Sequence, residues 1–210
     1  LRGNYPPSKD KTPVKDDAPS DPIKKFDLAI ADGKLSPAQL ADAYKNRAMA
    51  YEDRGDLNQA VADYNAAISK YYPLLASIHN NRGVTYMGKG DLDQAITDFG
   101  RSIELNPSKA STYGNRGIAL WKKGQFDKVV ADYTKMIELT PKSAKAYNNR
   151  GSAYEQLGDL DKAIADYTRA IEIDPTYGPA YHNRGIAHSK KDKNIEADAD
   201  FRKARELGVQ

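Results

Sequence analysis

A chain of 210 residues without a single cysteine excludes disulfide bonds, thiolate catalysis and cysteine-based zinc sites. It has 32 Lys and Arg against 29 Asp and Glu, with both signs interspersed along the chain. A net charge of +3 distributed in this way is too small and too mixed to indicate a nucleic-acid surface. The mean hydropathy is −0.75 and no apolar run is long enough to span a bilayer, so we expect no direct membrane insertion.

Residues 1–21 are rich in Pro, Lys and Asp, a composition that cannot bury enough apolar surface to hold one conformation. We therefore predict a disordered leader. Residues 22–40 have a different pattern, because Phe26, Ala29 and Ile30 have the spacing of one helix face. Gly33 ends this predicted helix, and Ser36-Pro37 begins the next one. The segment is predicted to be an N-terminal capping helix and its connection.

Beyond residue 40 the chain repeats itself. The segment 148–175 reads as two amphipathic helices separated by Gly158 and ended by Pro175. The triplet Asn-Arg-(Gly or Ala) recurs in steps of 35, 34, 34 and 34, and a second marker, Asp followed by Tyr or Phe, recurs in the same register. The longer first step comes from one extra residue before Pro73. We predict five helical hairpins, at about residues 41–75, 76–109, 110–143, 144–177 and 178–210.

These repeats resemble the tetratricopeptide (TPR) family, whose period of about 34 residues carries small and aromatic residues at set places. In the fourth repeat those places hold Tyr147, Gly151, Tyr154, Ala163, Tyr167, Ala170 and Pro175. The resemblance implies an all-α protein, a right-handed α-solenoid of about five hairpins with an N-terminal capping helix. It also implies a non-catalytic scaffold that binds an extended peptide or a partner helix in its concave groove.

One alternative of another class is a structural self-association module whose groove or C-terminal face is occupied by another copy. The leader and the Asn-Arg-Gly repeats also resemble TPR proteins of alphaproteobacteria, many of which carry an export signal. This similarity favours a periplasmic or secreted location over a cytoplasmic one.

Enzyme chemistry has little support in the sequence. His182 and His188 are six residues apart, which places them on different helix faces, and His79 and His188 stand where sister repeats have Tyr. No metalloprotease, nucleophile-elbow or phosphate-loop motif occurs. We therefore predict no enzyme activity, no metal site and no cofactor.

Every repeat has an arginine on or beside its packed face and an aspartate sixteen residues later. A partly buried arginine needs acceptors. The arginines could form an anion-binding ladder, or each could pair with its own aspartate, which explains why the aspartate recurs. We favour structural ion pairs in the couples Arg47 and Asp63, Arg82 and Asp98, Arg116 and Asp132, Arg150 and Asp166, and Arg184 and Asp200.

The resemblance also implies groove residues on the first helix of each repeat. An asparagine at this place often hydrogen-bonds the backbone of a bound peptide, which makes candidates of Asn46, Asn81, Asn115, Asn149 and Asn183. The alternative is that these side chains bridge neighbouring hairpins. Lys145, Asn149 and Asn183 match part of the carboxylate clamp of chaperone-binding TPR domains, but no sixth repeat completes that clamp.

The apolar part of the predicted groove is greatest in repeats two and three. There the groove-facing pairs are Val84 with Met87 and Ile118 with Trp121, the only tryptophan. We predict that these residues accept an apolar anchor while the asparagines hold the backbone beside it. The alternative is that Trp121 folds onto the next helix as ordinary core.

The last repeat ends at Leu207-Gly208 without a following amphipathic helix. Its stripe of Phe201, Ala204 and Leu207 is predicted to face outward without the polar cap that solenoids need. This pattern predicts an association surface at the C-terminal end, and therefore a possible homodimer.

Overall fold

The computed structural model describes residues 21–70 and 75–209, and all regular structure in these two ranges is α-helical. The predicted all-α solenoid is thereby confirmed. The helices of the described ranges are α1 (Pro22–Ala31), α2 (Pro37–Asp53), α3 (Leu57–Ile68), α4 (Leu75–Gly88), α5 (Leu92–Leu105), α6 (Ala110–Lys122), α7 (Phe126–Leu139), α8 (Ala144–Gln156), α9 (Leu160–Ile173), α10 (Gly178–Ser189) and α11 (Asn194–Glu206). None of them combines the length and the apolarity that crossing a membrane requires.

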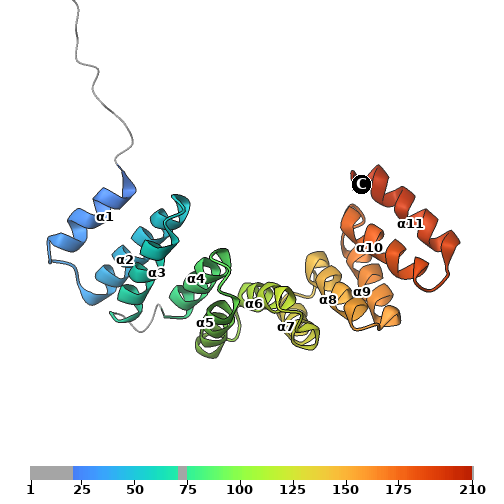
Figure 1. The fold of residues 1–210 in the computed structure, drawn as a ribbon, viewed down its shortest axis with the longest axis horizontal. Helices are drawn as coiled ribbons and strands as arrows, with labels where there is room; N and C mark the ends of the chain where they lie inside the picture. The colour runs from blue at the N-terminus through green and yellow to red at the C-terminus, as the bar shows by residue number, and fades with distance from the viewer. Residues whose placement is uncertain (1–20, 71–74, 210) are drawn as a thin grey trace, which may run out of the picture.

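The helices pair as successive hairpins: α2 with α3, α4 with α5, α6 with α7, α8 with α9, and α10 with α11. The second helix of each hairpin also packs against the first helix of the next one. Figure 1 shows these pairs along a curved line, with α4, α6 and α8 on the inner side of the curve and α5, α7 and α9 on the outer side. The first helices of the central repeats therefore supply the concave surface.

The N-terminal helix α1 packs against α2 and buries Ile23. Its N-cap is Asp21, whose carboxylate accepts from the Ile23 backbone N–H at 3.1 Å and also pairs with Arg54 at 2.5 Å. The helix begins at Pro22, the first residue of the predicted capping segment, and Asp21 at the end of the predicted leader caps it. The rest of the predicted leader and the extra residue before Pro73 lie outside the described residues.

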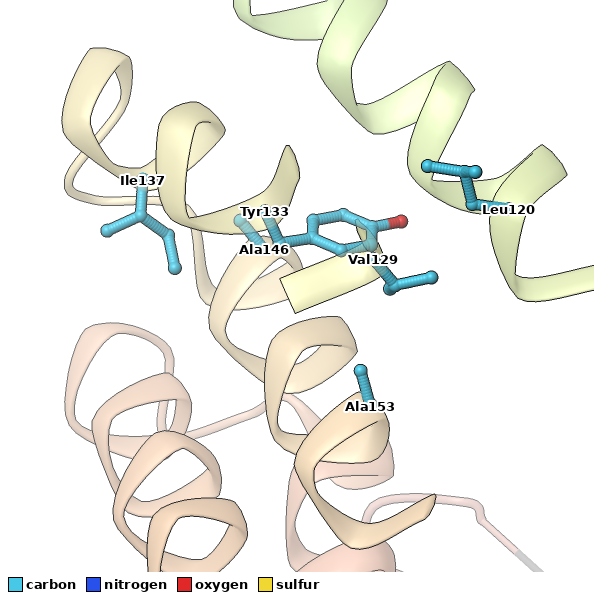
Figure 2. Close-up of a cluster of buried hydrophobic side chains, with 6 residues drawn as sticks. All are labelled: Leu120, Val129, Tyr133, Ile137, Ala146 and Ala153. Atoms are coloured by element: carbon cyan, nitrogen blue, oxygen red, sulfur yellow. The ribbon is translucent and has the colours of Figure 1, made fainter. Parts of the chain in front are cut away.

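An aromatic ring packed under a glycine holds each of the last four hairpins together. A Cβ added to Gly151 would come within 2.9 Å of the Tyr167 ring, and Gly83, Gly117 and Gly185 meet their own aromatic partners in the same way. The glycines allow the two helices to approach closely, because a larger residue would collide with the ring. Figure 2 shows the corresponding cluster of repeats three and four, in which Leu120, Val129, Ile137, Ala146 and Ala153 gather around Tyr133.

The C-terminal stripe faces outward only in part, because Ala204 is buried while Phe201 and Leu207 are half-buried. Ala204 is 1% exposed, and the Phe201 ring lies under Gly185 of the same repeat. The same spacing in repeat four packs Tyr167 and Ala170 against the first helix of their own hairpin. The prediction of an outward stripe overlooked this correspondence. The positions at which other repeats present Val or Ile to the following hairpin hold Asp198 and Arg205 in α11. These charged residues make the end face partly polar, but Ile195 of the same helix is 85% exposed, and a homodimer through this face stays a prediction.

The turn inside each hairpin needs one residue with positive φ. Four repeats place a glycine there, with φ between 70° and 82°, at Gly55, Gly90, Gly124 and Gly158. The fifth repeat has Asp192 at the same place, with φ of 56°. Any residue other than glycine is strained when its backbone lies in the left-handed region.

We therefore expect Asp192→Gly to raise the free energy of unfolding by about 0.5 to 1 kcal/mol, the net of relieved strain and added chain entropy. Urea denaturation followed by circular dichroism measures the change. Gly158→Ala is the matched control and should destabilise by about 1 kcal/mol. Loss of stability in Asp192→Gly would mean that the Asp192 side chain makes a compensating contact in solution.

Candidate functional site

Each repeat contains an arginine–aspartate pair in the same geometry. In repeat four, Arg150 donates from Nε to Oδ2 of Asp166 at 2.7 Å and from Nη2 to Oδ1 at 2.8 Å. The other four couples repeat this two-pronged contact at distances between 2.5 and 2.8 Å. The aspartates are buried, and the Arg150 guanidinium also lies 5.6 Å from the ring centre of Tyr147. Such pairs join the two helices of one hairpin.

The remaining nitrogen of the guanidinium group, Nη1, connects neighbouring repeats. In four repeats, Nη1 of the arginine donates to the residue that follows the aromatic of the preceding outer helix, at 2.5 to 3.1 Å. The couples are Arg47 to Asp27, Arg82 to Asn65, Arg150 to Thr134, and Arg184 to Thr168. Because these four guanidinium groups already have protein acceptors on both sides, their geometry does not favour the anion-binding ladder that the sequence left open.

Repeat three departs from this pattern. The residue after the aromatic of α5 is Gly100, which has no side chain to accept from Arg116. A Cβ added to Gly100 would lie 3.8 Å from Nη1 of Arg116, an ordinary contact distance. The Arg116 side chain is 27% exposed, against 17% to 20% for the other four arginines. The connection between repeats two and three therefore lacks one hydrogen bond that the other connections have.

We expect Gly100→Thr to raise the free energy of unfolding by about 1 to 2 kcal/mol, because it removes a glycine from a helix interior and supplies an acceptor for Arg116. Thermal and urea denaturation measure the gain. Gly100→Ala separates the two effects, since it should give only the helix-propensity part, about 0.5 to 1 kcal/mol. Equal stability of the Thr and Ala variants would contradict the predicted hydrogen bond.

The aspartate of repeat two has an additional partner. Burial alone would raise the pKa of Asp98, but hydrogen bonds from Arg82 and His79 lower this pKa below its ordinary value of 3.8. His79 Nδ1 lies 2.9 Å from Oδ1 of Asp98. His79 stands where sister repeats have Tyr, so it works as a packing and hydrogen-bonding residue. Burial lowers the pKa of His188, and the ring of His182 packs edge-on against Phe201.

The asparagines of the first helices bridge neighbouring hairpins. Asn115 donates to Oδ1 of Asn80 at 3.1 Å, and Asn183 donates to Oδ1 of Asn148 at 3.0 Å. Asn149 instead donates to the hydroxyl of Tyr133 at 2.9 Å, because repeat three has Gly114 at the place of Asn80. The amide nitrogens of these three asparagines are therefore used to bridge hairpins, as the alternative prediction states. The carbonyl oxygen of Asn149 accepts from Asn148 at 3.4 Å, which leaves those of Asn115 and Asn183 to accept from a peptide backbone.

A pocket of about 250 Å³ opens between α6 and α8 on the concave side. It is lined by Ile118, Trp121 and Lys122 of α6, Tyr133 of α7, and Asn149 and Ser152 of α8. We call it the Trp121 pocket. Three residues of the predicted groove, Ile118, Trp121 and Asn149, thus meet in one cavity. Tyr133 was not among the predicted groove residues, although the recurring Asp-Tyr marker places a tyrosine beside the next first helix.

The large apolar side chains on this surface are partly open to solvent. Trp121 and Ile118 are each 36% exposed and Val84 is 38% exposed. The indole of Trp121 lies edge-on to Phe126, with ring centres 5.1 Å apart, so one side of it is supported by its own repeat. Burial raises the pKa of Tyr133, whose hydroxyl accepts from Asn149 at the pocket wall.

Other predicted groove residues lie outside the Trp121 pocket. Met87 is partly buried against the cluster of Ala95 and Phe99, which makes it more a core residue than a groove residue. Lys145 is exposed at the start of α8, one turn before Asn149. Within residues 21–70 and 75–209, no group of three or more His, Cys, Asp or Glu is arranged to hold a metal ion.

Family comparison agrees with this architecture. Family models described as the tetratricopeptide repeat match residues 41–69, 76–109, 144–177 and 166–199, and one described as the TPR repeat matches residues 122–158. The chain belongs to the tetratricopeptide repeat family. Its class is therefore that of a protein-interaction scaffold, the role for which this repeat is typically used. A comparison with curated protein sequences found no match.

Solved structures of similar fold include a crystal structure of MamA, with 28% sequence identity and a TM-score of 0.71 over 75% of this chain and 91% of that chain. YrrB, described as a TPR protein with an unusual peptide-binding site, aligns with 22% identity and a TM-score of 0.73 over 89% of this chain and 93% of its own. The C-terminal part of a TPR repeat-containing protein from Cytophaga hutchinsonii has 23% identity and a TM-score of 0.77, over 88% and 72%.

Proposed function

We propose that this protein is a non-catalytic scaffold that binds an extended peptide or a partner helix along its concave side. An apolar side chain of the ligand enters the Trp121 pocket, and asparagine side chains hold the ligand backbone beside it. This arrangement follows the general mode in which a groove supplies one deep apolar contact and several polar contacts to the main chain.

The observation that carries the proposal is the composition and exposure of the Trp121 pocket. Its volume of about 250 Å³ can take one side chain, and its walls combine Ile118 and Trp121 with the polar groups of Asn149 and Ser152. Large apolar residues kept at 36% exposure are costly to leave in water, and their burial by a partner stabilises the complex. Tryptophan is also among the residues most enriched at binding hot spots.

The non-catalytic part of the proposal is supported by the use of the repeated carboxylates. The five buried aspartates each pair with an arginine, and Glu52 and Glu155 accept from the hydroxyls of Tyr64 and Tyr167. Carboxylates held in this way connect helices, and their positions are explained without proton transfer or metal binding.

A selection from a random peptide library, with binding checked by calorimetry, tests the proposal. We expect the enriched peptides to share one aromatic or large aliphatic residue. The wild-type protein should bind them as a monomer. Size-exclusion chromatography with light scattering on the same sample measures the oligomeric state. A stable dimer that binds no peptide from the library would contradict the proposal and favour a groove occupied by a second copy.

A further inference from the structure

The junction of repeats two and three is built differently from the other junctions. Where α5 meets α6, the buried residues include two polar ones, Ser102 and Thr112. At the place of Ser102 the other repeats have Ala67, Met136, Ala170 and Ala204, and at the place of Thr112 they have Ala43, Ile78, Ala146 and Ala180. A polar pair thus replaces apolar residues at one junction out of several. Buried polar groups require partners, so this exception calls for an explanation.

A second cavity, of about 180 Å³, lies at this junction. Its walls include Asn80 and Asn81 of α4, Ser102 of α5, Asn106 and Lys109 of the connection, and Thr112 of α6. We call it the Thr112 pocket. Thr112 is 1% exposed, and its hydroxyl has no hydrogen-bond partner among the described residues. Leaving a buried hydroxyl unpaired costs about 1 to 3 kcal/mol, which a bound polar group would offset.

The polar groups that remain available in the Thr112 pocket are donors. The carbonyl oxygen of Asn81 already accepts from Asn80, and that of Asn106 accepts from the backbone N–H and hydroxyl of Ser108. The amide of Asn81 is hydrogen-bonded to the Tyr64 hydroxyl, so the amide nitrogen of Asn106 is the group left to face a ligand. Ser102 donates its hydroxyl to the backbone carbonyl of Ala76.

The electrostatics of the pocket favour an anion. Lys109 is the one charged residue among the described residues that line it. Lys109 is also the N-cap residue of α6, and its side chain makes no capping hydrogen bond. The Thr112 N–H donates to the Lys109 carbonyl, which leaves the N–H groups of the first two residues of this 13-residue helix without a capping partner. A helix N-terminus carries a partial positive charge and binds anions through such groups.

We propose that the Thr112 pocket binds a carboxylate group, supplied by the same peptide that occupies the Trp121 pocket, so its source rests on the proposed function. The pocket offers one full positive charge, which matches the single charge of a carboxylate. Phosphate carries more charge and is usually held by arginines, and no arginine lines this pocket. A carboxylate accepts from several donors at once, as the Asn106 amide, Lys109 and the helix N-terminus require.

Titration of the free protein with acetate, followed by amide chemical shifts in NMR, tests the pocket without any peptide. We expect saturable shifts concentrated at residues 110–112 and at the side-chain amide of Asn106. Thr112→Ala and Lys109→Ser should each weaken acetate binding about tenfold, the effect of losing one hydrogen bond to a charged group. Ala146 and Ala180 occupy the place of Thr112 in sister repeats without exposure, so Thr112→Ala should keep the fold.

Lys142→Ser is the matched control, because Lys142 lies in the equivalent connection between repeats three and four. It should leave acetate binding unchanged. Shifts of equal size in wild type and Thr112→Ala, or no saturable shift, would overturn the pocket as a binding site. Phosphate binding more tightly than acetate would overturn the assignment to a carboxylate.

A peptide arm separates this proposal from the proposed function. A library-selected peptide is compared with its C-terminal amide and with versions in which each acidic residue becomes its amide. We expect one of these changes to weaken binding about tenfold in wild type and to have no effect in Lys109→Ser. If none does so while binding still depends on Trp121, the carboxylate proposal fails and the groove proposal stands.

Discussion

Replacing Asp166 by alanine is expected to lower the free energy of unfolding by about 3 kcal/mol, the largest stability effect we predict for a single residue. The change leaves the guanidinium of Arg150, whose side chain is 18% exposed, without the two oxygens that now accept from it. Removing one partner of a largely buried pair costs more than the pair contributes, because the remaining charge is desolvated and uncompensated. Urea denaturation followed by circular dichroism measures the loss.

Asp161→Ala is the control for this prediction. Asp161 lies on the same helix and pairs with Lys191 of the next repeat, but its side chain is 85% exposed. An exposed ion pair contributes at most about 1 kcal/mol, so the control should stay within that range. Similar losses in the two variants would show that the Arg150 pair behaves as a surface pair, contrary to its burial.

The repeat architecture was predictable from the sequence because two markers recur in one register. The arginine and the aspartate sixteen residues later define one hairpin, since they belong to its two helices and face each other across it. Their hydrogen bonds are present in every repeat, as in Arg116 with Asp132. The acceptors that join neighbouring repeats were missed. Asp27, Asn65 and Thr134 each offer a side-chain oxygen but belong to different residue types, so no repeated residue marks their place.

The end of the solenoid was misassigned for a related reason. The spacing of Phe201, Ala204 and Leu207 identifies an apolar helix face but not the neighbour that this face meets. Only the correspondence of Phe201 with Tyr167, which packs under Gly151, shows that the stripe faces its own first helix. In the groove, the spacing of Ile118 and Trp121 was sufficient to predict that they line one site, because residues three apart share one helix face. Packing between the hairpins leaves this face open.

Replacing Trp121 by alanine is expected to weaken binding of a library-selected peptide by about 2 kcal/mol or more, close to thirtyfold in Kd. The indole forms one wall of the Trp121 pocket and is 36% exposed in the unbound protein. Its main ring contact is with Phe126, so we expect a smaller loss of stability, about 1 kcal/mol. Calorimetry gives the affinity, and thermal denaturation gives the stability of the same sample.

Leu157→Ala is the matched control, because Leu157 is another large apolar residue, 43% exposed, that does not line the Trp121 pocket. It should leave the affinity unchanged. A variant of Trp121 that melts at a much lower temperature and still binds the peptide fully would assign the indole to the core. The binding surface would then lie elsewhere on the solenoid.

The most direct test of the groove is to locate the bound peptide. A photoreactive group is placed at the apolar anchor residue of a library-selected peptide, and the cross-linked sites are read by mass spectrometry. We predict cross-links on α6 and α8, at Ile118, Trp121 or Ser152, which line the Trp121 pocket. Cross-links on the outer helices α5 or α9, or on α7 away from Tyr133, in place of these residues would contradict binding in the concave groove.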